Sequence, residues 1–204
     1  NMANNNAQNL MELVDNVLDL EKVEAGRMDF KPEVLNVNAA VEDAVASMRH
    51  YLPDKKLTWT VTNLAGELTI LVHPGRLRQV MLNLLSNAAK FSPIAGRVEV
   101  EIGIETDSVV IACLDEGKGV DPSFEDQLFS RFSQEAKTTT KGSKQGTGLG
   151  LNLVKMMVQH MSGDVSYKRR DGRTEFRISF PLHSSSEKIE METSLAETQH
   201  RKAS

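Results

Sequence analysis

Apolar residues recur at helical spacing near the start of the chain. Between residues 7 and 25, leucine and valine positions from Leu10 to Leu20 are separated by acidic residues, and Gly26 follows where a helix would end. This pattern predicts one amphipathic helix with a broad apolar stripe. We expect the stripe to be covered either by a helix from outside this segment or by the core of the same chain.

The chain from residue 32 to residue 183 alternates between helical and strand patterns. Helices are predicted at 39–51, 74–90 and 149–161, and strands at 57–62, 68–72, 98–104, 109–114, 165–168 and 174–180. Residues 32–38 form a predicted connector, 121–147 a long polar loop typical of a lid, and 184–204 a flexible tail or linker. The predicted fold class is therefore α/β (α+β), a two-layer sandwich in which helices cover one face of a mixed sheet, preceded by the separate helix.

Composition and charge remove several classes of function. The 204 residues carry a formal net charge of -4 at pH 7, and this acidic balance argues against a nucleic-acid partner. No run approaches the roughly 18 consecutive apolar residues of a membrane-spanning helix, so no membrane contact by this segment is expected. Cys113 is the only cysteine, which favours an intracellular setting on the cytoplasmic face, whether the full-length protein is membrane-anchored or soluble.

Polar side chains follow one stripe of the helix predicted at 74–90. They are Arg76, Gln79, Asn83, Asn87 and Lys90. The two asparagines lie one helical turn apart and offer carbonyl oxygens to a hard cation such as Mg²⁺, while Lys90 could meet a phosphate. An ordinary solvated helix face would give the same pattern, so this segment alone leaves both interpretations open.

Glycine-containing turns follow at two further places. Asp115 ends a buried strand before Gly117 and Gly119, which suits recognition of an amine donor but is also common in tight turns. Gly148 and Gly150 lie where a loop enters a helix, and free N–H groups there can bind phosphate, although a hinge would use the same residues. The spacing is neither that of a P-loop nor that of the dinucleotide fingerprint.

The three elements occur in a fixed order, with the predicted lid between the second and the third. In this order they resemble the boxes of sensor histidine kinases, which belong to the GHKL superfamily: the N box at 77–92 (LRQVMLNLLSNAAKFS), the G1 box at 114–120 (LDEGKGV), the F box at 128–132 (LFSRF) and the G2 box at 146–151 (GTGLGL). Residues 10–26 (LMELVDNVLDLEKVEAG) resemble the second helix of that family's dimerisation and phosphoacceptor hairpin. One departure is His73, where related kinases often carry Asp.

The resemblance implies a Bergerat ATP-binding fold with ATP and Mg²⁺ as cofactors. Asn83 and Asn87 would bind the metal, Asn83 and Lys90 would be catalytic, and Asp115 would accept a hydrogen bond from the adenine amino group. Phe129 and Phe132 would anchor the base of the lid. The complete set implied around the nucleotide is Asn83, Asn87, Lys90, Phe91, Asp115, Gly117, Gly119, Val120, Phe129, Phe132, Gly146, Thr147, Gly148, Leu149, Gly150 and Leu151.

By the same resemblance, residues 1–31 are part of the hairpin helix, 32–183 the catalytic ATP-binding domain and 184–204 the tail or linker. The domain would transfer the γ-phosphoryl group of ATP to a histidine, for relay to an aspartate of a response-regulator receiver domain, within a homodimer held by the hairpin helices. The family's acceptor histidine is followed by an acid, and none of the five histidines of this chain is. We therefore expect the acceptor outside this segment, and no self-phosphorylation by the segment alone.

Two other functions remain to be separated from a kinase. Topoisomerase, mismatch-repair and chaperone ATPases share the ATP-binding fold, but they place a Glu general base one helical turn before the metal-binding Asn, where this chain has Asn83. A nucleotide-binding or dimerisation module that has lost catalysis is the second alternative. Measuring phosphoryl transfer distinguishes it from an active kinase.

Overall fold

The computed structural model describes residues 2–28, 31–133 and 148–183. In chain order its elements are α1 (Met2–Glu24), β1 (Glu33–Asn36), α2 (Val37–Met48), the 3₁₀ helix η1 (Pro53–Lys55), β2 (Thr58–Asn63), β3 (Thr69–Val72), α3 (Pro74–Phe91), β4 (Arg97–Glu105), β5 (Ser108–Asp115), the 3₁₀ helix η2 (Pro122–Gln127), α4 (Gly150–His160), β6 (Asp164–Arg170) and β7 (Arg173–Pro181). The predicted tail at 184–204 lies outside the described residues.

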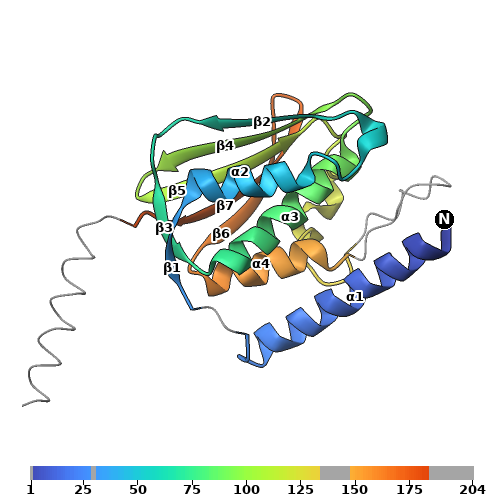
Figure 1. Ribbon diagram of the computed structural model, residues 1–204, viewed down its shortest axis with the longest axis horizontal. Coiled ribbons are helices and arrows are strands. Elements are labelled where there is room, and N and C mark those ends of the chain that lie inside the picture. Colours follow the sequence, from blue (N-terminus) through green and yellow to red (C-terminus); the bar gives the residue numbers. More distant parts are fainter. Residues whose placement is uncertain (1, 29–30, 134–147, 184–204) are drawn as a thin grey trace, which may run out of the picture.

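A five-stranded mixed sheet forms one layer of the molecule. Its strand order is β2-β4-β5-β7-β6, with β2 parallel to β4 and the other pairs antiparallel. Helices α2, α3 and α4 lie together over one face of the sheet (Figure 1). This arrangement confirms the predicted fold class.

The apolar pattern of each strand matches its place in the sheet. The central strand β5 is buried along nearly its whole length, as its continuous apolar run predicts. In β4, Val98, Val100 and Ile102 are fully buried under the helices, and the glutamates between them point to the helix-free face. The sheet therefore has one apolar face, which packs against the helices, and one polar face.

Three local predictions are corrected by the structure. The predicted connector at 32–38 contains β1, which pairs antiparallel with β3 in a separate two-stranded sheet. Helix α2 spans Val37–Met48 rather than 39–51. It begins early because the side chain of Asn36 accepts a hydrogen bond from the Ala39 N–H and caps the helix. Part of the predicted lid folds as η2, which begins after the similar cap Asp121.

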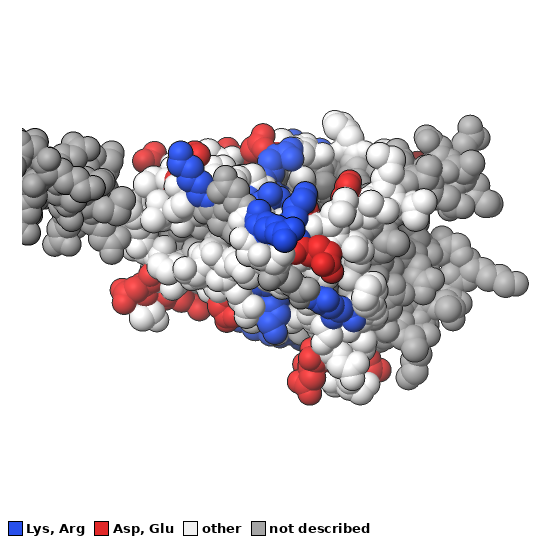
Figure 2. Space-filling model, turned by 90° about the horizontal axis from the view of Figure 1, so that it is seen from below, with Lys and Arg blue, Asp and Glu red and all other residues white. Residues whose placement is uncertain are grey.

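Among the side chains of α1 that the structure describes, the buried apolar ones lie near its C-terminal end. Leu20 and Val23 are buried, with 4% and 2% of their surface exposed, and α1 packs against α4. Further toward the N-terminus, Leu10 and Met11 are 62% and 66% exposed, and Leu18 is 51% exposed. Figure 2 shows the side of the molecule on which α1 lies, with acidic and basic side chains interspersed among uncharged ones. The core of the same chain therefore covers the part of the stripe around Leu20 and Val23. The exposed part around Leu10 and Met11 is where a helix from outside this segment is expected to pack.

Candidate functional site: the ends of α3, β5 and α4

The helix that carries the asparagine pair begins at a histidine cap. His73 has extended backbone, and its Nδ1 accepts a hydrogen bond of 3.1 Å from the Gly75 N–H, with Pro74 in the first turn. A cap of this kind is what an Asp at this position would also supply. His73, which stands where related kinases often carry Asp, therefore still caps the start of α3.

Asn83, the first residue of the asparagine pair, lies where α3 meets the first turn of α4. Asn83 and Asn87 are both half-buried. The Nδ2 of Asn83 donates to the Gln79 carbonyl at 3.2 Å. A Cβ placed on Gly150 would lie only 3.1 Å from Asn83 Oδ1, so a side chain there would crowd this oxygen. The structure thus brings the predicted N box and G2 box together.

Asp115 is buried at the end of β5. Only 2% of the residue is exposed, and its Oδ1 accepts a hydrogen bond of 2.7 Å from the Gly117 N–H. Burial raises the pKa of this carboxyl to about 6, against the opposing effects of hydrogen bonds from Gly117 and Thr174 and of the positive charges of Arg169 and Lys55. A carboxylate held in this way presents a strong acceptor at the end of a central strand.

The glycines after Asp115 permit close packing against the end of α3. A Cβ on Gly117 would lie 2.5 Å from Asp115 Oδ1 and 3.1 Å from the Phe91 carbonyl oxygen, so no side chain fits. Gly119 has a φ of +80°, in the left-handed region that favours glycine. The predicted G1 box is therefore in contact with the last turn of the N box.

Two residues of β6 that the sequence pattern does not indicate support the G1 segment. Arg169 donates to the Gly117 carbonyl at 2.9 Å and to Thr174 Oγ1 at 3.1 Å. The hydroxyl of Tyr167 accepts a hydrogen bond of 3.0 Å from the Val120 N–H. Their spacing of two places them on one face of the strand, but nothing in the sequence indicates which loop that face meets.

The two aromatic residues of the F box differ in their environment. The ring of Phe129 packs edge-on against Phe176, with centroids 6.4 Å apart, and its carbonyl accepts a hydrogen bond of 2.9 Å from Asn152 of α4. Phe132 is 65% exposed. Phe129 therefore contacts the core whereas Phe132 is largely exposed, and the role of both phenylalanines at the base of the lid stays a prediction, because residues 134–147 of the lid lie outside the described residues.

The flanks of the predicted lid lie against each other. Gly148 has a φ of +71°, and a Cβ there would come within 2.9 Å of the Phe132 carbonyl carbon and 3.0 Å of the Ser133 carbonyl oxygen. Leu149, next along, is buried with 1% exposed. The predicted site residues Gly146 and Thr147 lie outside the described residues.

The remaining predicted residues surround the same region. Lys90 is half-buried and Phe91 is 59% exposed at the end of α3, while Leu151 packs against the core from α4. Among the described residues, no group of three histidine, cysteine or acidic side chains could hold a metal ion. Two amide oxygens on one helix fit Mg²⁺ that is bound partly through substrate phosphates, since Mg²⁺ rarely uses an all-protein cage.

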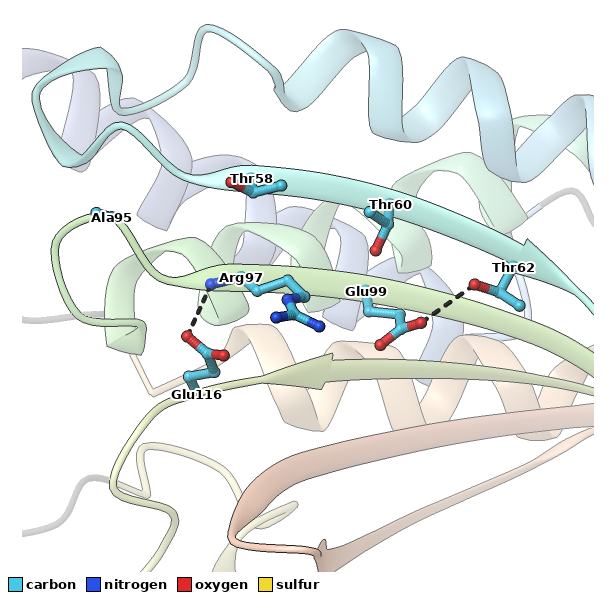
Figure 3. A pocket seen from close by; sticks show the side chains of 7 residues that line it. All are labelled: Thr58, Thr60, Thr62, Ala95, Arg97, Glu99 and Glu116. Atoms are coloured by element: carbon cyan, nitrogen blue, oxygen red, sulfur yellow. Dashed lines mark hydrogen bonds between the residues drawn. The ribbon is translucent and has the colours of Figure 1, made fainter.

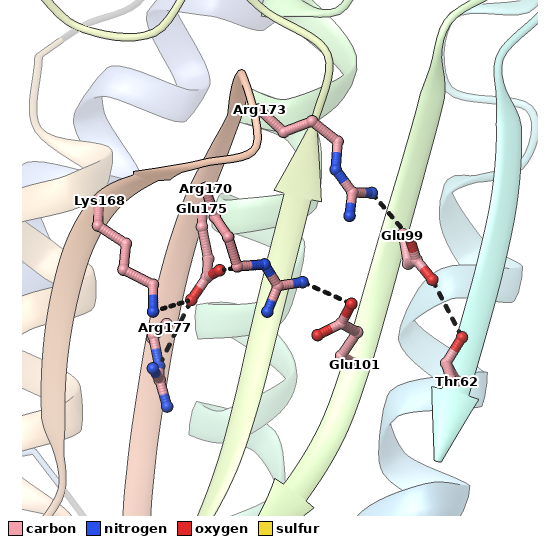
Figure 4. A network of polar contacts seen from close by, with 8 residues as sticks. All are labelled: Thr62, Glu99, Glu101, Lys168, Arg170, Arg173, Glu175 and Arg177. Atoms are coloured by element: carbon pink, nitrogen blue, oxygen red, sulfur yellow. Dashed lines mark hydrogen bonds and ion pairs between the residues drawn. The ribbon is translucent and has the colours of Figure 1, made fainter. Parts of the chain in front are cut away.

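Two cavities lie on the helix-free face of the sheet. The first, of about 440 Å³, is lined by Thr58, Thr60, Thr62, Ala95, Arg97, Glu99 and Glu116 (Figure 3). The second borders a network of ion pairs around the fully buried Glu175, which meets Arg170 Nε at 3.0 Å and Lys168 Nζ at 3.4 Å (Figure 4). Neither cavity contains a predicted site residue.

Comparison with known proteins identifies the family. The family described as "Histidine kinase-, DNA gyrase B-, and HSP90-like ATPase" matches residues 72–184, which is more than half of the chain. The chain belongs to this family. The matched span contains all the predicted nucleotide-binding residues, from Asn83 to Leu151.

Similar proteins within this family include sensor histidine kinases. The Autoinducer 2 sensor kinase/phosphatase LuxQ of Vibrio harveyi is 31% identical over 182 residues, which cover 86% of this chain but 21% of the relative. Full-length ShkA, whose structure was solved in complex with AMPPNP, is 26% identical, with a TM-score of 0.74 over 86% of this chain and 36% of ShkA. The chain is thus homologous to the ATP-binding catalytic domains of two-component sensor kinases, and spans a small part of these proteins.

A third comparison concerns the fold alone. The histidine kinase ThkA, in complex with the response regulator protein TrrA, has a TM-score of 0.72 at 14% identity, covering 90% of this chain and 50% of ThkA.

Across the part of the chain that the structure describes, no helix combines the length and the apolar character needed to span a membrane.

The raised pKa of Asp115 predicts a pH dependence of stability with a definite sign. The folded pKa of about 6 lies above the ordinary aspartate value of 3.8, so this residue makes the unfolding free energy rise as the pH falls from about 6 toward 3.8. Asp115→Asn cannot titrate and should lack this contribution. Denaturant unfolding at pH 7.5 and pH 5 measures this contribution. The increase in unfolding free energy from pH 7.5 to pH 5 should be larger for the wild type than for Asp115→Asn, and an equal increase in both would contradict the assignment.

Proposed function

We propose that this domain transfers the γ-phosphoryl group of ATP to a histidine outside this segment, for relay to an aspartate of a response regulator. The observation that carries the proposal is the convergence of three elements on one site, namely the Asn83 and Asn87 stripe of α3, the buried Asp115 of β5, and Gly150 at the start of α4. No residue of α3 from Pro74 to Phe91 is acidic, so this helix offers no general base for water.

Each element has a defined task in this proposal. Asp115, as a carboxylate, accepts a hydrogen bond from the adenine amino group, and Gly117 lets the chain after Asp115 pack against the end of α3. Asn83 and Asn87 would hold Mg²⁺, which neutralises phosphate charge when bound. Lys90 and the N–H groups before α4 would orient the phosphates, because phosphoryl transfer depends on positioning and charge stabilisation.

The partners follow from the exposed parts of the chain. The uncovered apolar positions of α1, including Leu10 and Met11, support a homodimer in which a hairpin helix covers them. A response-regulator receiver domain is the proposed acceptor of the relayed phosphoryl group, by similarity to ThkA, whose structure was solved in complex with the response regulator protein TrrA. We also propose the division into 1–31, 32–183 and 184–204 as hairpin helix, catalytic domain and tail or linker.

A general base introduced at position 83 separates this proposal from a conformational ATPase. We expect wild-type hydrolysis to be slow and Asn83→Glu to raise it by about tenfold or more, since a positioned base contributes roughly 10²-fold or greater. Asn83→Gln is the matched control, because it lengthens the side chain without adding a base. Steady-state phosphate release measures the rates. Rapid wild-type turnover that both variants leave unchanged would favour the ATPase class.

A further inference from the structure

Lys55 joins two distant parts of the chain at the end of α3. It is half-buried at the end of η1, and its Nζ donates to the carbonyl oxygens of Ala89 at 2.9 Å, Lys90 at 2.6 Å and Ser92 at 2.6 Å. An ammonium group has three donors, so all of them are used. The backbone carbonyl of Lys55 accepts a hydrogen bond of 2.7 Å from the Ala95 N–H, which is a second link between η1 and the segment after α3.

This position matters because the last carbonyls of a helix have no partners within it. They also carry the negative end of the helix dipole, which a positive charge stabilises. Lys55 therefore holds the last turn of α3 at a fixed place. Three converging carbonyls suit a compact ammonium better than a planar guanidinium, whose donors point in fixed directions.

The turn held by Lys55 borders the candidate nucleotide site. The three carbonyls flank Phe91, whose own carbonyl oxygen lies 3.1 Å from the position of a Cβ on Gly117. Asp115 lies two residues before Gly117, and the positive charge of Lys55 lowers the pKa of its carboxyl. The other groups that act on Asp115 are Arg169 from β6 and the hydrogen bonds from Gly117 and Thr174.

We propose that Lys55 is a positioning residue for nucleotide binding, whose ammonium group sets the last turn of α3, with Lys90 and Phe91, against Gly117 at the end of β5. This inference rests on the proposed function, because it assumes that ATP binds between these elements. Lys55 acts through the backbone of α3 and through its charge near Asp115.

The test compares Lys55→Met with Lys56→Met. Lys56 is exposed and adjacent, so both variants lose one charge, but only the first removes the contacts to α3. Calorimetric titration with Mg–AMPPNP from pH 5 to pH 8 gives affinity and its pH midpoint. Lys55→Met is expected to bind about tenfold or more weakly at pH 7.5, since it loses charge-assisted hydrogen bonds. Its midpoint should lie above that of the wild type, because Asp115 loses a neighbouring positive charge.

Lys55→Arg separates charge from geometry and remains informative if Lys55→Met fails to fold. It should keep a pH midpoint near that of the wild type and bind more weakly, because its planar group cannot serve three converging carbonyls. Wild-type affinity in Lys55→Arg, or a folded Lys55→Met that matches Lys56→Met in affinity and midpoint, would overturn the inference. Failure of the wild type itself to bind Mg–AMPPNP would instead refute the proposed function.

Discussion

Asp115→Asn is expected to weaken binding of Mg–AMPPNP by about tenfold to a hundredfold at pH 7.5. Asp115 Oδ1 is already occupied by the Gly117 N–H at 2.7 Å, and the variant would keep this contact through its amide oxygen. Its NH₂ group would then face the adenine amino group, which is also a donor. The variant loses a hydrogen bond to a charged acceptor, worth about 1.5–3 kcal/mol.

The control for this prediction is Asp107→Asn, which removes the same charge beyond the opposite end of β5. Asp107 is exposed in the turn that connects β4 to β5. The Asp107→Asn variant should bind Mg–AMPPNP with the affinity of the wild type in the same calorimetric titration. An Asp115→Asn variant that binds within twofold of the control would show that Asp115 does not contact the base.

Asn87→Ala is expected to remove most of the dependence of nucleotide binding on Mg²⁺. Asn87 lies one turn beyond Asn83 on α3, and the variant would leave a single amide oxygen for the metal. The ratio of AMPPNP affinities with Mg²⁺ and with EDTA should fall by about tenfold or more, since loss of groups that support a metal typically costs 10-fold to 100-fold.

Gln159→Ala is the matched control for the metal site. It removes an exposed amide from the last turn of α4, away from the asparagine pair. The same two titrations should give the wild-type ratio. If Asn87→Ala also keeps the full effect of Mg²⁺, Asn87 is not a metal ligand, and the amide pair of α3 loses its proposed role.

Patterns within single elements were sufficient for most of the fold. The apolar run of β5 and the alternation of β4 come directly from the burial that these strands have in the sheet. Helix α3 was predicted at 74–90 and ends at Phe91. Strand β1 was missed because its four residues gain their structure from pairing with β3, which a local pattern does not reveal.

In the candidate site, too, local patterns in the sequence indicated some residues and could not indicate others. The sequence indicated the residues of the boxes, because their spacing along a helix or after a strand is local. The contacts of Lys55 with α3 and of Arg169 with Gly117 join residues 34 to 52 positions apart, so they depend on how the layers pack. Phe132 was assigned to the base of the lid from its place in the F box, and its exposure in the structure depends on packing that the local sequence does not reveal.

The most direct test of the proposed kinase activity is labelling with γ-labelled ATP. The full-length protein is compared with the present chain, and labelled residues are identified after acid and base treatment. We predict an acid-labile, base-stable phosphate on a histidine outside this segment, no label on the present chain alone, and loss of labelling in Asp115→Asn. Label on one of the five histidines of this chain, or an unlabelled full-length protein that binds Mg–AMPPNP normally, would contradict the proposal.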